Sequence, residues 1–322
     1  MSKKICVVGG GRWGQNHIRT MHELGNLGGI VESNPARLKE LLEKYPVKGF
    51  NDVGEALKEN FDGFTIAVPA PLHFEIAKQI IESGKPVMVE KPLTLSSESS
   101  KELVELAKKH NVQLMVGHVL LFHPAIKKIK EVIDAGKIGE LYYIYSNRLN
   151  LGTVRTEENV FWSFAPHDVS VLDYLVGAPS IDIDSKGSRF LQKNVYDYTL
   201  TQLSYPNNVQ AHIFVSWLHP FKEQRLVVIG SKGMILFEDS SEKKEIKFYN
   251  KQIEFEQGIP VKVENPDEII PYDRKQPLAE ELKYFVENMD GTIEIANGAS
   301  GYEVVKVLER SQELIDKKSS AL

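Results

Sequence analysis

Residues 5–14 read ICVVGGGRWG, an apolar run that leads directly into closely spaced glycines. Gly9, Gly11 and Gly14 have the spacing G-x-G-x-x-G. In that pattern the first glycine permits a tight turn, the second lets the backbone approach a pyrophosphate, and the third allows helix and strand to pack closely. The stretch therefore predicts a strand, a phosphate-binding turn that includes Arg12 and Trp13, and a helix whose free N–H groups favour phosphate.

A second predicted strand, GGIVES at 28–33, places Glu32 18 positions after Gly14. This spacing is close to the ~20 residues expected for the acid that binds the adenosine ribose of a dinucleotide. A carboxylate there accepts a hydrogen bond from the 2′-hydroxyl and repels a 2′-phosphate. The pattern favours NAD over NADP, although Ser33 and Asn34 do not add to that repulsion. A glycine turn with a purely structural use is the alternative.

The composition is that of a water-soluble globular protein of two domains. The chain has 322 residues, is 42% hydrophobic and 26% charged, and carries a formal net charge of −5. Lysine and arginine are scattered, so we expect no nucleic-acid partner. The N-terminal apolar stretch is too short for a signal peptide, and no apolar run approaches the ~20 residues that cross a bilayer. With its single cysteine, Cys6, in an apolar run, the chain is expected to be cytoplasmic.

The pattern of apolar residues predicts an α/β protein. Up to about residue 120, short apolar runs alternate with amphipathic segments, which is typical of βαβ units on a parallel sheet. Longer strand-like runs follow, separated by turn signals at 205–208 and 230–233, and indicate a large, open, mostly antiparallel sheet. We expect a Rossmann domain over residues 1–120 and a second α/β domain over 121–322, with the last two helical stretches able to cross back. The open sheet suggests a homodimer or homotetramer.

A lysine at the end of an apolar run is the second chemical signal. Residues 87–94 read VMVEKPLT, so Glu90 and Lys91 close a predicted strand and Pro92 ends it. The preceding strand, in FTIAVPAPLH at 64–73, ends near Pro69 and is followed by His73. Carboxyl ends of parallel strands line the ligand crevice of such sheets. The pattern predicts that Lys91 projects toward the nicotinamide, with Glu90 fixing it, and that Pro69 and His73 lie near the cofactor.

These motifs together resemble the glucose–fructose oxidoreductase, inositol dehydrogenase and rhizopine-catabolism (Gfo/Idh/MocA) family. The resemblance rests on the glycine pattern, the Val-Pro…His segment and Glu90-Lys91-Pro92, and extends over nearly the whole chain. It implies a Rossmann domain followed by an α/β domain with an open sheet. It also implies a catalytic histidine in a motif Asp-x-Gly-x-His-x-x-Asp. Here residues 163–170 read SFAPHDVS, so His167 matches while both flanking acids are serine and the glycine is alanine.

Longer stretches, at 117–126, 147–168 and 215–239, resemble a branch of nucleotide-sugar 3-dehydrogenases. That resemblance implies a UDP-N-acetylglucosamine or its uronic acid as substrate, oxidised at C3 by NAD. Oxidation of a secondary alcohol requires a hydride acceptor and a base within hydrogen-bond reach of the hydroxyl. We expect the hydroxyl to lie between Lys91 and His167, with His167 as base and Lys91 as electrostatic orienter. Further candidates for substrate binding are His118, Arg148, Arg155 and Trp162.

Three other functions remain open from the sequence. The chain could oxidise a free sugar or inositol, which needs no arginine clamp for a diphosphate. It could also run as a 3-ketoreductase. A dinucleotide-sensing binding protein on the same fold is the non-enzymatic alternative, and the joint presence of Lys91 and His167 counts against it. No group of Cys, His, Asp and Glu has the spacing of metal ligands, so no metal is expected.

Overall fold

The computed structural model describes residues 2–319. The chain divides into two compact units. The first runs to His123 and resumes over Lys275–Lys306; the second covers Pro124–Arg274 and the residues from Val307 onward. Residues 275–306 therefore belong with the first unit, whereas the sequence placed all residues from 121 in the second domain and only allowed for helices that cross back.

The first unit is built on a parallel sheet. Its strands are β1 (Ile5–Val8), β2 (Leu27–Val31), β3 (Lys48–Phe50), β4 (Gly63–Ile66), β5 (Val87–Glu90) and β6 (Leu114–Gly117). They are arranged in the order β3-β2-β1-β4-β5-β6, and every pair is parallel. This is the order of a dinucleotide-binding Rossmann fold. All residues of β1, β4, β5 and β6 are buried, as expected for strands covered on both faces.

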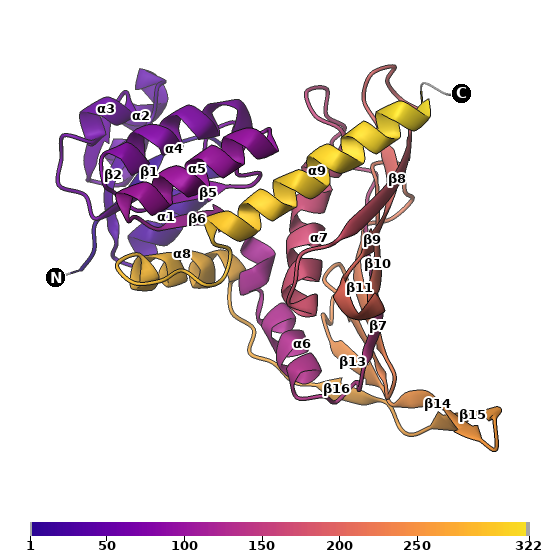
Figure 1. The fold of residues 1–322 in the computed structure, drawn as a ribbon. Helices are drawn as coiled ribbons and strands as arrows, with labels where there is room; N and C mark the ends of the chain where they lie inside the picture. Colours follow the sequence, from indigo (N-terminus) through magenta and orange to yellow (C-terminus); the bar gives the residue numbers. More distant parts are fainter. Residues whose placement is uncertain (1, 320–322) are drawn as a thin grey trace. The chain divides into compact units, whose positions relative to one another are not determined.

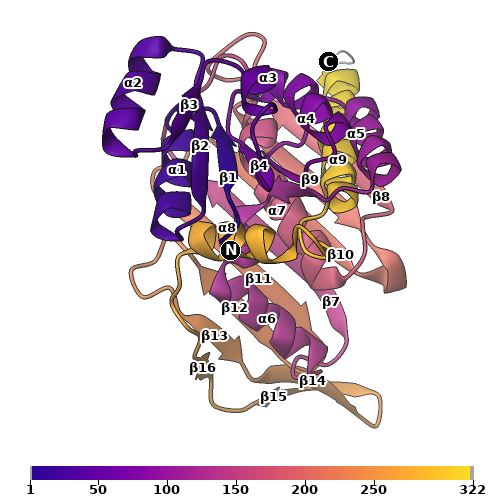
Figure 2. The ribbon, with the colours of Figure 1, turned by 90° about the vertical axis from the view of Figure 1, so that its left-hand side faces the viewer.

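Helices surround this sheet (Figure 1). They are α1 (Gly14–Glu23), α2 (Pro35–Lys44), α3 (Val53–Ala56), α4 (His73–Glu82), α5 (Ser97–His110) and α8 (Pro277–Asn288), with short 3₁₀ turns η1 (Ala70–Leu72) and η2 (Val119–Phe122). The chain steps outward from β1 in one direction and from β4 in the other, so right-handed crossovers put the two sets of helices on opposite faces. Helices α4 and α5 pack side by side, and α1 packs against α8 (Figure 2).

Local sequence signals explain where these helices begin and end. Asn34 caps α2 by accepting hydrogen bonds from the N–H groups of Ala36 and Arg37, and Pro35 occupies the first turn. Ser96 caps α5 in the same way. Beyond α4, Gly84 adopts a positive φ of 76°, which a residue without Cβ adopts at little cost. These local signals account for the start of α2 and α5 and for the end of α4.

The second unit contains a larger sheet. Its strands are β7 (Leu141–Leu149), β8 (Asp182–Ser188), β9 (Tyr198–Ser204), β10 (Gln210–Ser216), β11 (Glu223–Gly230), β12 (Met234–Glu238), β13 (Ile246–Tyr249) and β16 (Glu268–Ile270). They are arranged in the order β16-β13-β12-β11-β7-β10-β9-β8. Only β7 and β10 pair in parallel, so the prediction of a mostly antiparallel sheet is confirmed.

One face of the larger sheet carries helices. The helix α7 (Val160–Val176) packs on β7, β9 and β10, and α6 (Pro124–Asp134) packs on α7. Alternate residues of β7, such as Ile144 and Ser146, are buried on this side. Helix α9 (Gly298–Ser319) contributes its second half, from Val307, to this unit. The 3₁₀ turn η3 (Pro206–Asn208) joins β9 to β10 where a hairpin turn was predicted.

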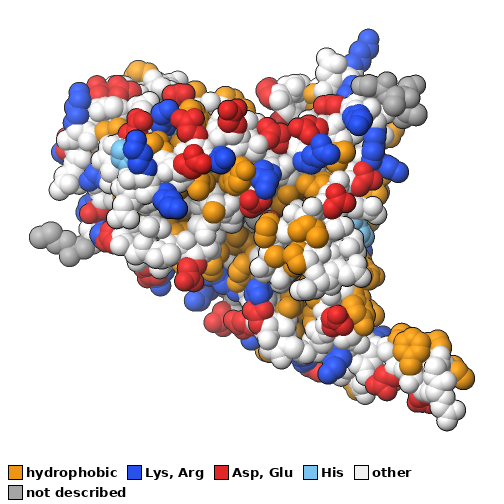
Figure 3. Space-filling view, viewed as in Figure 1, with side chains coloured by type: hydrophobic (Ala, Val, Ile, Leu, Met, Phe, Trp, Pro, Cys, Tyr) orange, Lys and Arg blue, Asp and Glu red, His pale blue; other side chains and the backbone are white. Residues whose placement is uncertain are grey.

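A separate two-stranded ribbon extends from the second unit. Strands β14 (Lys251–Glu256) and β15 (Ile259–Glu264) pair only with each other. Apolar side chains gather toward its tip (Figure 3), where Ile253, Phe255 and Ile259 are exposed. The ribbon adds little to the core of the unit, and the candidate site residues lie elsewhere in the sequence.

Candidate active site

The glycine turn after β1 has the geometry that a pyrophosphate requires. Gly9 has a φ of 103°, and a Cβ there would lie 2.7 Å from the carbonyl oxygen of Ala67. A Cβ on Gly14 would lie 2.0 Å from the carbonyl oxygen of Gly9, so only glycine lets α1 begin this close to the turn. At Gly11 a Cβ would meet nothing within 4 Å, which leaves room above the turn for a ligand. The residues present therefore fit the diphosphate of NAD.

The loop between Gly11 and Gly14 adds two exposed side chains. Arg12 and Trp13 are both exposed, and Trp13 stands at the N-cap of α1 without capping it through its side chain. The first N–H groups of α1 are therefore not capped by this residue and are directed toward the open side of the turn. When bound, NAD would supply a hydride acceptor, its nicotinamide ring.

Glu32, at the end of β2, is held in place by backbone and side-chain donors. Its Oε2 accepts hydrogen bonds from Gly10 N at 2.9 Å and from Arg37 Nη1 at 3.2 Å, and its Oε1 accepts one from Asn34 N at 2.8 Å. Burial alone would raise the pKa of this carboxyl, but these donors outweigh burial and hold the pKa below its usual value. Glu32 is therefore a fixed carboxylate beside the glycine turn, as the NAD hypothesis requires.

Glu90 connects the glycine turn to the strand that carries Lys91. Its Oε1 accepts hydrogen bonds from Trp13 Nε1 at 2.6 Å and from His17 Nε2 at 2.8 Å, while Oε2 accepts one from Lys91 N at 3.2 Å. The carboxyl packs over Gly117, where a Cβ would approach it to 2.8 Å. Burial would raise the pKa of Glu90, but the hydrogen bond and charge of His17, the Trp13 donor and the charge of Lys91 together lower it.

Lys91 follows β5 directly and is half-buried. The peptide bond between Lys91 and Pro92 is cis. His73 braces this bend, since its Nδ1 lies 2.8 Å from Pro92 O and its Nε2 lies 3.0 Å from Val68 O. Burial lowers the pKa of His73, although both carbonyls favour the protonated ring. His73 thus ties the ends of β4 and β5 together, and Pro69 lies exposed at the start of η1.

His118 directly follows β6, at the same edge of the sheet as Lys91. It is only 1% exposed, and among residues 2–319 neither ring nitrogen has a hydrogen-bond partner. Burial lowers the pKa of His118 to about 4, with the charge of Lys91 lowering it further and that of Glu90 opposing. The ring is therefore a neutral base close to both charged groups of the cluster. Whether it contacts substrate stays a prediction.

His167 lies in α7, in the second unit, and is half-buried. Its neighbour Asp168 is buried and points to the sheet: it accepts hydrogen bonds from Ser146 Oγ at 2.6 Å and from Arg148 Nε and Nη2 at 2.9 and 3.1 Å. Asp168 is therefore engaged by β7. The pairing of His167 with a substrate hydroxyl stays a prediction.

Arg148 differs from the expectation of a diphosphate clamp. Its guanidinium forms a two-bond ion pair with Asp168, and its side chain is only 14% exposed. A carboxylate that already occupies this planar fork neutralises its charge, which favours a structural role for Arg148. Arg155 is exposed and pairs with Glu158 at 3.1 Å, and Trp162 is half-buried in the first turn of α7. Of the two arginines, Arg155 is the more exposed.

The sequence interpretation missed His17, which the structure places against Glu90. The signal was present, because His17 lies three residues after Gly14 and four before the buried Met21, on the inner face of α1. A histidine there is fully buried beneath the glycine turn. In residues 2–319 no group of three or more His, Cys, Asp and Glu side chains is arranged to hold a metal ion. None of the helices over the same residues is long and apolar enough to span a membrane.

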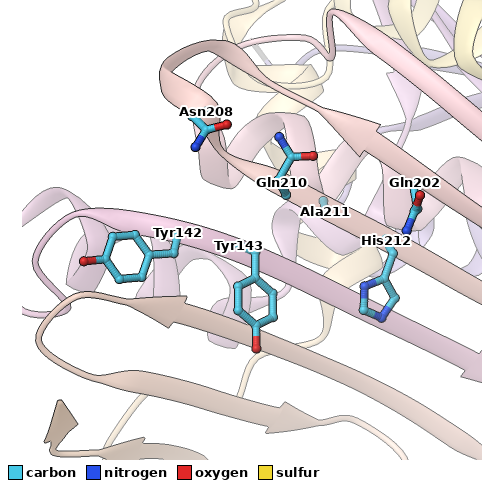
Figure 4. A pocket seen from close by; sticks show the side chains of 7 residues that line it. All are labelled: Tyr142, Tyr143, Gln202, Asn208, Gln210, Ala211 and His212. Atoms are coloured by element: carbon cyan, nitrogen blue, oxygen red, sulfur yellow. The ribbon is translucent and has the colours of Figure 1, made fainter. Parts of the chain in front are cut away.

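A cavity of about 430 Å³ lies on the second unit, on the sheet face opposite α7 (Figure 4). Its lining includes Tyr142 and Tyr143 of β7 and Gln210 and His212 of β10. On the same face the rings of Tyr145 and His212 stack with parallel planes, and their centroids lie 5.1 Å apart. None of the predicted site residues lines this cavity.

Comparison with known proteins agrees with the geometry. A model described as the oxidoreductase family, NAD-binding Rossmann fold, of Gfo/Idh/MocA proteins matches residues 3–118, and the Gfo/Idh/MocA C-terminal domain model matches residues 126–236. Inositol 2-dehydrogenase of Corynebacterium glutamicum is 28% identical over 193 residues, 58% of this chain and 57% of that protein. UDP-N-acetylglucosamine 3-dehydrogenase of Acidithiobacillus ferrooxidans is 28% identical over 182 residues, 56% of each chain.

Solved structures show the same fold over nearly the whole chain. The structure of UDP-N-acetylglucosamine 3-dehydrogenase from Acidithiobacillus ferrooxidans superposes with a TM-score of 0.86 at 21% identity and covers 98% of both chains. A dehydrogenase from Bordetella pertussis, solved with NADH and UDP-GlcNAcA, superposes with a TM-score of 0.80 at 19% identity and covers 99% of this chain and 98% of its own.

Proposed function

This chain belongs to the Gfo/Idh/MocA oxidoreductase family, and we propose that it oxidises the C3 hydroxyl of a nucleotide-linked sugar, UDP-N-acetylglucosamine or its uronic acid. The observation that carries an enzymatic role is the arrangement around Glu90. One carboxylate joins Trp13 and His17, next to the cofactor turn, to the backbone of Lys91. A binding protein that only sensed the dinucleotide would gain nothing from a lysine fixed in this way.

The proposed roles follow from the charges. Lys91 presents an ammonium at the carboxyl edge of the sheet, where a developing alkoxide would be stabilised electrostatically. His167 would accept the hydroxyl proton, since an imidazole needs no tuning to act near neutral pH. NAD would accept the hydride. The support for the nucleotide sugar is the likeness to the UDP-N-acetylglucosamine dehydrogenase and to the complex with UDP-GlcNAcA.

A second candidate substrate is a free sugar or inositol. The observation that favours it is the ion pair of Arg148. Its guanidinium already donates two hydrogen bonds to Asp168, so these donors are not available to bind a diphosphate. The inositol 2-dehydrogenase relative supports the same reading. The two candidates share cofactor and chemistry, and differ in whether an arginine binds the substrate's phosphates.

The test is NADH formation with a substrate panel. The purified protein, freed of bound nucleotide, is given NAD with UDP-N-acetylglucosamine, its uronic acid, UDP-glucose, glucose and myo-inositol in separate reactions. Turnover with one UDP-sugar supports the proposal. Turnover with glucose or myo-inositol alone overturns the nucleotide-sugar assignment and retains the family chemistry. Bound NAD without turnover on any alcohol, in either direction, contradicts the enzymatic role.

A further inference from the structure

A second buried carboxyl lies near Glu90, on a helix that returns late in the sequence. Glu281, in α8, is 0% exposed, and within residues 2–319 neither of its carboxyl oxygens has a hydrogen-bond partner. Helix α8 packs against α1, which carries His17, and against η2, which follows His118. The carboxyl of Glu281 is close enough to Glu90 for the charge of Glu90 to act on it.

The two carboxyls have opposite surroundings. Three donors converge on Glu90, from Trp13, His17 and the Lys91 backbone. No described donor reaches Glu281. A buried carboxylate without donors is strongly disfavoured, and a neighbouring anion disfavours it further. Two nearby carboxyls with such different environments take different protonation states.

We propose that Glu281 is a positioning residue that enters this cluster as a neutral carboxylic acid and so leaves Glu90 as its single carboxylate. Burial, and then the charge of Glu90, raise the pKa of Glu281 well above its usual value, in agreement with this assignment. One anion is then matched by the Trp13 and His17 donors and by the charge of Lys91. A second anion would draw a further proton into the cluster.

The other titratable groups around Glu281 agree with a neutral acid at Glu281 and a carboxylate at Glu90. On α1 they are His17, which is fully buried, and Arg19, His22 and Glu23, which are exposed. His118 and His123 flank η2, and Lys91 follows Glu90. On α8 itself, Glu280, Lys283, Tyr284 and Glu287 lie at or near the surface. His118 is held neutral by burial, so it does not supply a positive charge to Glu281.

The charge state has a consequence for folding that needs no substrate. A carboxyl whose pKa is raised in the folded protein keeps its proton while the unfolded chain releases it. The folded state is then favoured below the ordinary value of 4.5, and this advantage is lost as pH rises toward the folded pKa. Over that window the folding constant of the wild type should fall about tenfold per pH unit relative to a variant that cannot ionise there.

The experiment compares Glu281→Gln with Glu287→Gln, an exposed glutamate of the same helix. Infrared spectra are recorded at neutral pH for the wild type, E287Q and E281Q. The carbonyl band of a protonated carboxylic acid should appear when the E281Q spectrum is subtracted from that of the wild type or of E287Q. In urea unfolding, E281Q should gain stability over the wild type progressively as pH rises from 4.5 upward. Absence of the band, or a loss of stability in E281Q that grows with pH, overturns the proposal. Glu281→Met, of similar length, keeps the unfolding test usable if the glutamine variant folds poorly.

The positioning role rests on the proposed oxidoreductase function, and its readout is the pH profile of kcat/KM. Glutamine is neutral at every pH, so E281Q should match the wild type while Glu281 keeps its proton and depart from it only at alkaline pH, where the wild type gains a second anion beside Glu90. A difference between the two profiles at neutral pH as large as the 10²-fold or so expected of a proton-transfer group overturns the role. If no substrate turns over, the infrared and unfolding results still decide the charge state, and only the proposed function fails.

Discussion

The Nε2 atom of His17 lies 2.8 Å from Oε1 of Glu90, and the two residues are separated by 73 positions in the sequence. The pair joins α1, which begins at the cofactor turn, to the strand that ends in Lys91. Both side chains are buried, so the hydrogen bond is shielded from solvent. It couples the part of the fold that binds NAD to the part that presents the candidate catalytic lysine.

Replacing His17 should lower the free energy of unfolding by the contribution of this hydrogen bond. We expect His17→Leu to lower the free energy of unfolding by about 1.5–3 kcal/mol, since it removes a donor from a buried carboxylate. His17→Gln, whose amide nitrogen can take the place of Nε2, should retain most of it. Urea unfolding gives the difference, with His22→Leu on the exposed side of α1 as control. Equal losses in the leucine and glutamine variants would contradict the assignment.

The same pair predicts a pH dependence. The pKa of Glu90 is lowered in the folded state, so its contribution to stability is present above the ordinary value of 4.5 and is lost as pH falls through the folded pKa. The stability gap between the wild type and His17→Leu should therefore narrow in acid. A gap that stays constant below pH 4.5 would show that ionised Glu90 does not depend on His17.

Variants of Arg148 and Arg155 distinguish an arginine with a structural role from one that binds substrate. Arg148→Met leaves Asp168 buried without its partner, and should cost about 3–5 kcal/mol of unfolding free energy. Arg155→Met changes an exposed residue and should stay within about 0.5 kcal/mol. If Arg155 contacts a diphosphate, its variant should raise KM for the UDP-sugar alone. A stable Arg148→Met protein with raised KM would instead make Arg148 the clamp.

Glu32 should set the choice between NAD and NADP. Glu32→Gln removes the charge that repels a 2′-phosphate and releases Arg37 from its ion pair. A charge-assisted hydrogen bond of about 1.5–3 kcal/mol corresponds to a fall in NAD preference of roughly 10–150-fold. Titration of each cofactor, with Glu40→Gln on the exposed side of α2 as control, measures the change. An unchanged ratio of the two affinities would remove Glu32 from the ribose site.

We propose that the sheet face bearing Tyr145 and His212 forms the contact of a homodimer or homotetramer. The stacked pair lies on the side of the sheet away from α7, beside the cavity lined by Tyr143 and Gln210. A charge introduced by His212→Glu should lower the mass measured by light scattering, whereas Lys101→Glu on α5 should not. A wild-type protein that is monomeric at all concentrations contradicts this proposal.

The sequence was most informative where one periodicity or one motif determines the structure. Buried parallel strands read as continuous apolar runs, and Asn34 with Pro35 marked the start of α2, so most of the first unit could be predicted. Strand β8, with the sequence DIDSKGS, was missed because it lies at the edge of its sheet and shows no apolar alternation. The ribbon of β14 and β15 was missed because most of its residues are exposed.

The candidate site, too, could be predicted only in part from the sequence. The motif located Glu90 and Lys91, but the partners of Glu90 come from residues that no short pattern links to it. Glu281 stands in a helix rich in glutamate and looks solvated beside Glu280. Its position four residues before the buried Phe285 was the available signal. Likewise the carboxylate that engages Arg148 comes from α7, 20 positions later, and only the fold brings it to β7.

The most direct test of the account is Lys91→Met, with Lys101→Met on the exposed face of α5 as control. Methionine keeps the length of the side chain and removes its charge. NAD affinity should stay close to that of the wild type, while kcat for the best substrate of the panel should fall roughly 10²–10³-fold, the loss expected when a preorganised electrostatic group is removed. A Lys91→Met protein that binds NAD and turns over at the wild-type rate would contradict the central claim that this lysine serves the chemistry.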